Sequence, residues 1–248
     1  MIVTPPGLSV SLRPPTTPDN LESDQLWGLE LFYEDNLNGQ TVAYNGNITA
    51  MKWGDNSSGT TKTRGYAYDY DKMDRLTTAD YGEGSNLTTN SGAFTVENLA
   101  YDANGNISQL DRKAAGETGT SVIDQLTFAY TGNQLLEVDD AQTAEGFTDG
   151  TNTGDDYSYD DMGNLLTDEN KGIDMIVYNV INKVESIQFS DGKSIEYIYS
   201  ASGQKLSMKT YQSGTLIKTT DYVGNALYED SALKLFGTSE GRVTVEDN

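Results

Sequence analysis

One pattern of hydrophobic and polar positions recurs along this chain, about every 20 residues in its clearest stretch, which is typical of a repeat architecture. Its fullest copy is Tyr157-x-Tyr159-Asp160-x-x-Gly163-Asn164-Leu165. Alternate side chains of a strand share a face, so Tyr-x-Tyr places two aromatic rings on the same side. Asp160 can accept hydrogen bonds that close a turn, and Gly163 can adopt a positive φ there. One copy therefore predicts a β-hairpin with an aromatic anchor.

Related copies occur between about residues 28 and 244. A single hairpin is marginally stable in water, so the hairpins are expected to line up in a larger sheet. We predict an all-β fold in which consecutive antiparallel hairpins form one curved, spiralling sheet. The residues expected to build the repeats are Tyr44, Tyr70, Tyr101, Gly105, Tyr130, Tyr159, Gly163, Tyr178, Tyr199, Gly203 and Tyr222.

The turn positions of these copies carry specific expectations. Gly105 and Gly163 are predicted to have positive φ. In the copy from Tyr68 to Leu76, Asp74 stands where glycine is expected, and Asp tolerates left-handed geometry better than most residues. Ser213-Gly214 predicts a tight hairpin turn between two alternating runs. Residues 81–84 carry a weak signal for a short helical turn.

The N-terminal segment differs in composition from the rest. Residues 1–20 hold all five prolines of the chain, and proline lacks the N–H group that a β-ladder needs. We therefore predict an extended arm over residues 1–20, followed by the hairpin array over residues 21–248.

The Tyr-Asp dipeptides resemble those of the Rhs/YD-repeat family. They occur at Tyr68-Asp69, Tyr70-Asp71, Tyr101-Asp102 and Tyr159-Asp160. In that family the repeats coil into a hollow shell around a C-terminal, often toxic, domain, and relatives include toxin-complex components and teneurins. The resemblance implies a non-enzymatic structural scaffold that is secreted or displayed at the cell surface. Its implied partners are the remainder of a larger Rhs-type polypeptide or its cargo domain. The last residues resemble the segment that leads into the Rhs core, so this chain is expected to be a fragment ending just before that core.

Charge and missing residue types exclude several functions. The net charge is −22, with 38 acidic and 16 basic residues, which argues against binding nucleic acid or anionic membranes. The chain has no cysteine and no histidine, so Ser-His-Asp triads, Cys-His pairs and Cys/His zinc sites are excluded. No apolar run approaches the ~20 residues that a membrane span needs. We therefore expect no enzymatic activity, no cofactor and no membrane insertion.

The sequence contains two kinds of candidate carboxylate site. Adjacent acids at 139–140, 155–156 and 160–161 could serve glycoside hydrolysis, but such pairs are expected by chance in so acidic a chain. Asp149, Asn152, Asp155 and Asp156 form a weak candidate calcium loop, because hard cations prefer oxygen ligands. This loop lacks the EF-hand spacing, and a solvated turn explains it equally well.

The alternative function is a carbohydrate- or partner-binding β module of a cell-surface protein, using exposed tyrosine and tryptophan rings. The regular spacing of the tyrosines favours mutual packing instead. A binding module should show an aromatic cluster out of register with the repeat, for which Trp27 and Trp53 are the candidates.

Overall fold

The computed structural model describes residues 18–19, 21, 27–35, 37–39, 41–56, 60–116, 119–142, 145–150 and 154–245. Most of the predicted arm over residues 1–20 lies outside these residues. The described residues form strands and one 3-10 turn, η1 (Glu169–Lys171), which confirms the all-β prediction. The strands are β1 (Trp27–Phe32), β2 (Ala50–Asp55), β3 (Lys62–Tyr70), β4 (Leu76–Glu83), β5 (Val96–Tyr101), β6 (Ile107–Gly116), β7 (Gly119–Thr131), β8 (Gln134–Asp140), β9 (Tyr157–Tyr159), β10 (Leu165–Asp168), β11 (Ile173–Tyr178), β12 (Val184–Phe189), β13 (Lys193–Tyr199), β14 (Lys205–Gln212), β15 (Thr215–Val223), β16 (Ala226–Glu229), β17 (Ala232–Thr238) and β18 (Gly241–Thr244).

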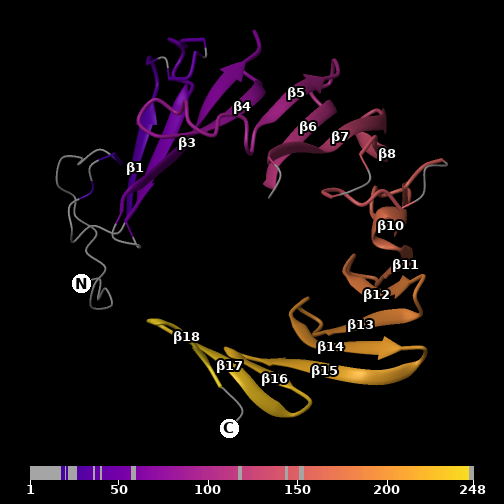
Figure 1. Cartoon of the computed structure of the whole chain (residues 1–248). Helices are drawn as coiled ribbons and strands as arrows, with labels where there is room; N and C mark the ends of the chain where they lie inside the picture. The colour runs from indigo at the N-terminus through magenta and orange to yellow at the C-terminus, as the bar shows by residue number, and fades with distance from the viewer. Residues whose placement is uncertain are drawn as a thin grey trace. The chain divides into compact units, whose positions relative to one another are not determined.

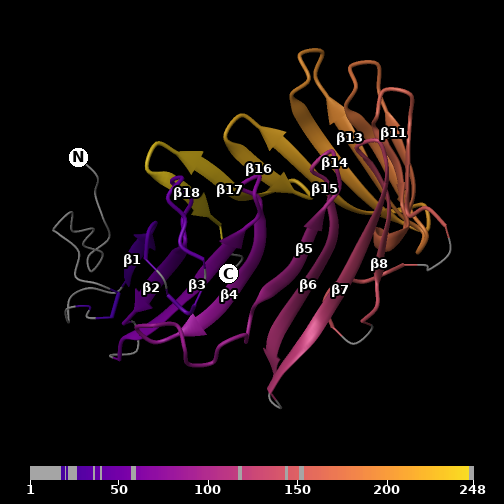
Figure 2. The same ribbon diagram turned by 90° about the horizontal axis from the view of Figure 1, so that it is seen from above.

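The strands form two antiparallel sheets in chain order, and not the single sheet that the sequence predicted. One sheet contains β1 to β8 and the other contains β9 to β18, and within each sheet the neighbours of a strand are those that precede and follow it in the sequence (Figures 1 and 2). By compactness the chain divides into two units. Residues 1–133 and 138–148 form unit 1, and residues 134–137 and 149–248 form unit 2.

In unit 1, one face of strands β1 to β4 is closed by loop segments. This face carries small residues, and a Cβ added at Gly54 would collide with the carbonyl oxygen of Pro18. Leu87, from the loop after β4, is fully buried and lies against Gly65 and Gly82. The glycines therefore let Pro18 and Leu87 approach the sheet backbone directly.

The expected helical turn at residues 81–84 is wrong. Strand β4 continues to Glu83, because Tyr81 pairs with Tyr66 and Glu83 pairs with Arg64 across the β3–β4 ladder. Cross-strand pairing and aromatic packing outweigh the weak local helical signal, since the Tyr81 ring meets the Tyr66 ring edge-on at 5.4 Å.

The turn predictions are confirmed by the backbone. Gly105 and Gly163 have φ of 90° and 81°, and Asp74 has φ of 61° at the matching position. Ser213 and Gly214, with φ of 48° and 78°, join β14 to β15, which is the conformation of a type I′ hairpin turn.

We predict that Gly163→Val destabilises the chain by about 1–2 kcal/mol, because a β-branched residue is strained at positive φ. Steric crowding does not contribute, because the nearest atom to an added Cβ is the Gln134 amide nitrogen at 3.9 Å. Thermal unfolding followed by circular dichroism measures it. Gly163→Asn is the matched control, because Asn182 holds the same turn position at φ of 56°. A Gly163→Val protein with the same melting temperature as the parent would contradict the explanation from backbone strain.

Candidate functional site

The repeat turns are closed by an aspartate that accepts three hydrogen bonds. In the copy that begins at Tyr101, Asp102 Oδ1 accepts from the backbone N–H groups of Asn104 (2.8 Å) and Asn106 (2.9 Å). Asp102 Oδ2 accepts from the side-chain amide of Asn106 at 2.8 Å. The turn is also closed by the Asp102 N–H, which donates to the Asn106 carbonyl. The aspartate of the Tyr-Asp dipeptide therefore serves the turn itself.

Two other copies repeat this geometry. Asp160 accepts from the N–H groups of Met162 and Asn164 and from the Asn164 amide. Asp71 accepts in the same way from Met73 and Arg75, where a guanidinium replaces the amide.

These bonds favour the charged form of each aspartate. The pKa of Asp102 lies below its ordinary value, chiefly because the Asn106 amide donates to the carboxylate. The Asn164 amide lowers the pKa of Asp160 in the same way, and the Arg75 guanidinium lowers that of Asp71.

Two copies have Asn179 or Ser200 in place of the aspartate, and they form the turn with a neutral acceptor. Asn179 Oδ1 accepts from the N–H groups of Ile181 and Lys183, both at 3.1 Å. Ser200 Oγ accepts from the Gln204 N–H at 3.1 Å. A neutral oxygen therefore suffices to form the turn.

The second recurring contact is a tyrosine hydroxyl that donates to a backbone carbonyl of the preceding copy. In each case the acceptor is the apolar residue that follows the preceding turn. The bonds in unit 1 are Tyr70 to Ile48 (2.7 Å), Tyr101 to Leu76 (2.7 Å) and Tyr130 to Ile107 (2.9 Å), and those in unit 2 are Tyr159 to Leu135 (2.8 Å) and Tyr178 to Leu165 (2.9 Å).

We call these five bonds the tyrosine ladder. Donor and acceptor are 22 to 25 residues apart in four of them and 13 apart in the fifth, so the contact persists when the intervening loop changes length. Burial of the rings raises the pKa of these tyrosines, which keeps each hydroxyl protonated as a donor.

Adjacent turns also contact each other within each unit. In unit 2 the amides of Asn164 and Asn182 exchange hydrogen bonds of 2.8 and 3.3 Å. In unit 1 the Asn106 amide donates to the Gly132 carbonyl at 3.2 Å, and the Arg75 guanidinium lies 4.5 Å from the centre of the Tyr101 ring.

The remaining repeat residues are placed differently. Tyr44 is 80% exposed and lies between β1 and β2. The Tyr199 ring lies 6.3 Å from the Tyr197 ring, and the Tyr222 ring lies 5.7 Å from the Lys205 ammonium group. Gly203 has φ of 81° at the turn of its copy.

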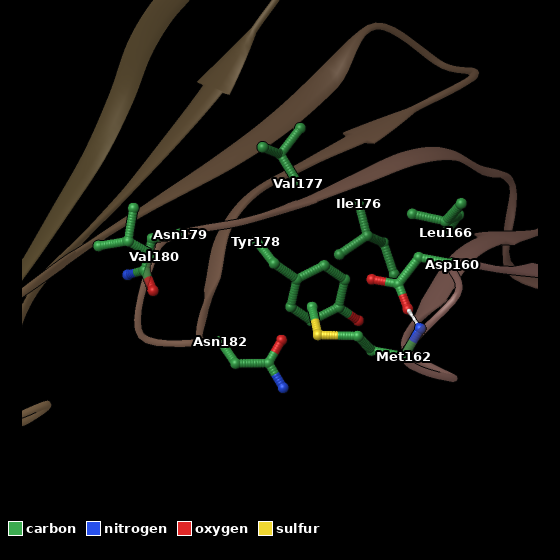
Figure 3. Close-up of a pocket in the computed structure, with 9 residues that line it drawn as sticks. All are labelled: Asp160, Met162, Leu166, Ile176, Val177, Tyr178, Asn179, Val180 and Asn182. Atoms are coloured by element: carbon green, nitrogen blue, oxygen red, sulfur yellow. Dashed lines mark hydrogen bonds between the residues drawn. The ribbon is translucent and has the colours of Figure 1, made fainter.

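A hollow of about 460 Å³ lies beside two neighbouring turns of unit 2. Figure 3 shows its lining side chains, which come from the turn after β9, from β10 and β11, and from the turn after β11: Asp160, Met162, Leu166, Ile176, Val177, Tyr178, Asn179, Val180 and Asn182. Asp160 is its only carboxylate and is already bound within its turn. The hollow can therefore accept an apolar group, but it does not bring two carboxylates together for hydrolysis.

One member of each acidic pair binds a loop or a turn. Asp140 Oδ1 accepts from the N–H groups of Gln125 and Gln142, and the buried Asp156 accepts from the Asn170 amide at 2.9 Å. Asp160 closes the turn described above.

The calcium candidates are only partly described. Asn152 lies outside the described residues, while Asp149, Asp155 and Asp156 lie within them. Across the described part of the chain, no three acidic side chains are grouped so as to hold a metal ion.

An aromatic cluster around Tyr66 includes the candidate Trp53 and the repeat residue Tyr68. Trp53 and Tyr66 stack at 6.0 Å, and Tyr66 and Tyr68 stack at 6.3 Å. Phe94 meets the buried Tyr81 edge-on at 5.0 Å. These rings therefore use much of their surface against one another.

The carbonyl acceptors of the tyrosine ladder were missed at the sequence level. Each belongs to the apolar residue after a turn, whose hydrophobic side chain gives no sign that its carbonyl accepts a hydrogen bond. The fixed position of that residue in every copy is the signal that could have revealed it.

Comparisons with known proteins return structural likenesses only. No protein-family model matches the chain, and no curated protein matches it. Solved structures similar to this chain include the TcdB2-TccC3-Cdc42 crystal structure, with a TM-score of 0.49, 11% identity and coverage of 86% of this chain and 12% of that one. The TcdB2-TccC3 crystal structure without the hypervariable C-terminal region gives a TM-score of 0.42, 15% identity and coverage of 77% and 11%.

The Photorhabdus luminescens Tc holotoxin pore gives a TM-score of 0.25, 9% identity and coverage of 85% and 16%. This chain therefore spans between 11% and 16% of the length of these structures. At these scores the likeness does not assign it to a family. Within the described residues, no helix is long and apolar enough to cross a membrane.

We predict that Tyr101→Phe and Tyr159→Phe each destabilise the chain by about 1 kcal/mol, because each leaves a partly buried carbonyl without its donor while keeping the ring. Chemical denaturation with a linear extrapolation measures the change. Tyr44→Phe is the control, since Tyr44 is exposed, and it should be neutral. Equal stability of all three variants would show that the ladder bonds contribute nothing.

We predict that the turn aspartates make stability fall in acid. A group whose folded pKa is depressed contributes fully above its unfolded pKa, here about 3.8, and the contribution is lost as pH falls through the folded pKa. Asp102→Asn keeps a neutral acceptor of the kind that Asn179 supplies. Its Tm should lie below that of the parent at neutral pH, and the gap should close below about pH 4. A gap that is constant with pH would contradict the charge-based explanation.

Proposed function

We propose that this chain is a non-enzymatic structural scaffold, a segment of a YD-repeat wall of the kind that encloses a cargo domain in Rhs-like proteins. The observation that carries the proposal is the tyrosine ladder. Five times, a repeat tyrosine bonds the backbone of the preceding copy, so the recurring residues serve the joining of one copy to the next.

The polar groups of the repeat support this function because their bonding capacity is used internally. The aspartates accept from their own turns, and the ladder hydroxyls donate to carbonyls. Catalysis needs groups aimed at a substrate, with a base within reach of a nucleophile or two convergent carboxylates. The hollow beside Tyr178 offers neither arrangement.

The role in encapsulation follows from the resemblance of the Tyr-Asp copies to Rhs repeats. On this proposal the partners are the remainder of a larger polypeptide and its cargo domain, and the protein acts outside the cell or at its surface. The antiparallel sheets with strands in chain order are an architecture from which such a wall can be extended by adding hairpins.

The carbohydrate-binding alternative would use the aromatic cluster around Tyr66. The stacking of Trp53, Tyr66 and Tyr68 on one another leaves less ring surface for a sugar. A glycan-array screen of the purified chain tests this alternative directly.

A substrate screen combined with hydrogen exchange tests the scaffold proposal. We expect no turnover on panels of glycosides, esters and peptides. We also expect the ladder strands β3, β5, β7, β9 and β11 to be protected from amide exchange without any ligand, because a scaffold is folded on its own. Turnover that a single Asp→Asn substitution abolishes would overturn the proposal, as would protection that appears only on adding a small molecule.

A further inference from the structure

Strand β1 is the first strand of its sheet. Among the strands that the structure describes, β1 pairs with β2 alone. The six residues of β1 pair with Ala50–Asp55 without a register shift, so the strand is regular along its whole length. Its second row of backbone N–H and C=O groups faces away from β2 and can pair with another strand.

Natural edge strands usually carry features that prevent such pairing. These are prolines, bulges, a very short length or outward charges, lysine above all. The β1 sequence WGLELF has no proline and no lysine, and its pairing shows no bulge. Its one charge, Glu30, lies opposite Lys52, with the carboxylate 3.7 Å from the ammonium group on the closed face of the sheet. Within the residues that the structure describes, the edge of β1 therefore carries none of these protective features.

The open face of β1 is apolar. Trp27, Leu29 and Leu31 alternate along the strand, and their side chains are 59%, 45% and 39% exposed. Tyr33 extends this row and is 46% exposed. The opposite face is covered, since a Cβ at Gly28 would lie 2.8 Å from the Leu21 side chain. A row of exposed apolar side chains beside an open edge is a typical interaction surface.

The negative charge next to this edge indicates that the partner segment is basic. The chain has a net charge of −22, and its sequence contains no lysine or arginine between Arg13 and Lys52. Glu34 and Asp35 directly follow the strand and are exposed. A basic segment is attracted to such a surface, whereas an acidic one is repelled. A second copy of this chain would bring the same exposed acids and the same net charge.

We propose that β1 docks an extended strand from another polypeptide by strand addition, and that this strand alternates apolar and polar residues and carries lysine or arginine at its ends. Backbone hydrogen bonds at the open edge supply affinity, and the alternate apolar side chains pack on Trp27, Leu29 and Leu31. The base at the end of the docked strand that lies beside the C-terminal end of β1 is near Glu34 and Asp35. This docking is a partner interaction beyond the scaffold role and does not depend on it.

A synthetic peptide is the direct probe. In the peptide Ac-KVTVTVK-NH2, three valines alternate with threonines between terminal lysines. The chain has two tryptophans, and Trp27 is the more exposed. We expect saturable binding that shifts tryptophan emission to shorter wavelength, because Trp27 leaves water. Leu29→Lys should weaken binding at least tenfold. Val243→Lys, at the exposed position of edge strand β18, is the matched control and should leave binding unchanged.

Two altered peptides test the mechanism on the unmodified chain. N-methylation of alternate residues on the pairing edge removes donors but keeps side chains, and it should abolish binding. Replacing the terminal lysines with glutamates should weaken binding at least tenfold at low salt. The proposal is overturned if no peptide binds at millimolar concentration, or if either altered peptide binds as well as the parent peptide.

Binding of a different occupant at the edge of β1 would also contradict the proposal. Light scattering should show the chain alone as a monomer, and a dimer that Leu29→Lys dissolves would identify a second copy as the occupant. A glycan that binds and is lost with Leu29→Lys would identify a carbohydrate instead.

Discussion

The hydrogen bond from a repeat tyrosine to the carbonyl of the preceding copy is the contact on which the rest of this structure depends. A β-hairpin is marginally stable alone, and backbone pairing between neighbouring strands does not by itself fix how successive turns are aligned. The repeat tyrosine is half-buried, and its hydroxyl binds a carbonyl next to the turn of the preceding copy. One side chain therefore supplies both apolar contact and register.

The aspartate turns make this contact repeatable. Because Asp102 and Asp160 close their turns with the same three bonds, the apolar residue after each turn emerges in the same place. Its carbonyl is then available to the next tyrosine, whatever the length of the loop between them. In such an array each copy contacts mainly its neighbours, so stability is expected to add up along the chain.

Much of the fold could be predicted from the sequence because its signals are local. The positive φ of Gly163 follows from the Asp-x-x-Gly turn, and the tolerance of Asp74 follows from the side-chain chemistry of aspartate. The carbonyl of Leu135 could not be predicted as the acceptor for Tyr159, because backbone acceptors leave no mark in residue identity. The strand at Tyr81–Glu83 was missed because its cause is the pairing with Arg64–Tyr66. The burial of Leu87 over Gly65 and Gly82 is likewise a tertiary contact without a local pattern. The open edge of β1 also depends on strand order, which the sequence pattern does not give for a terminal strand.

The central claim is most directly tested by observing the hydroxyl protons of the ladder tyrosines by NMR. With specifically labelled tyrosine, the hydroxyl protons of Tyr70, Tyr101, Tyr130, Tyr159 and Tyr178 should exchange slowly with water and show contacts to the acceptor residues Ile48, Leu76, Ile107, Leu135 and Leu165. The exposed Tyr44 hydroxyl should exchange rapidly. Rapid exchange of all six hydroxyls would contradict the account, because it would mean that the copies are joined by backbone pairing and ring packing alone.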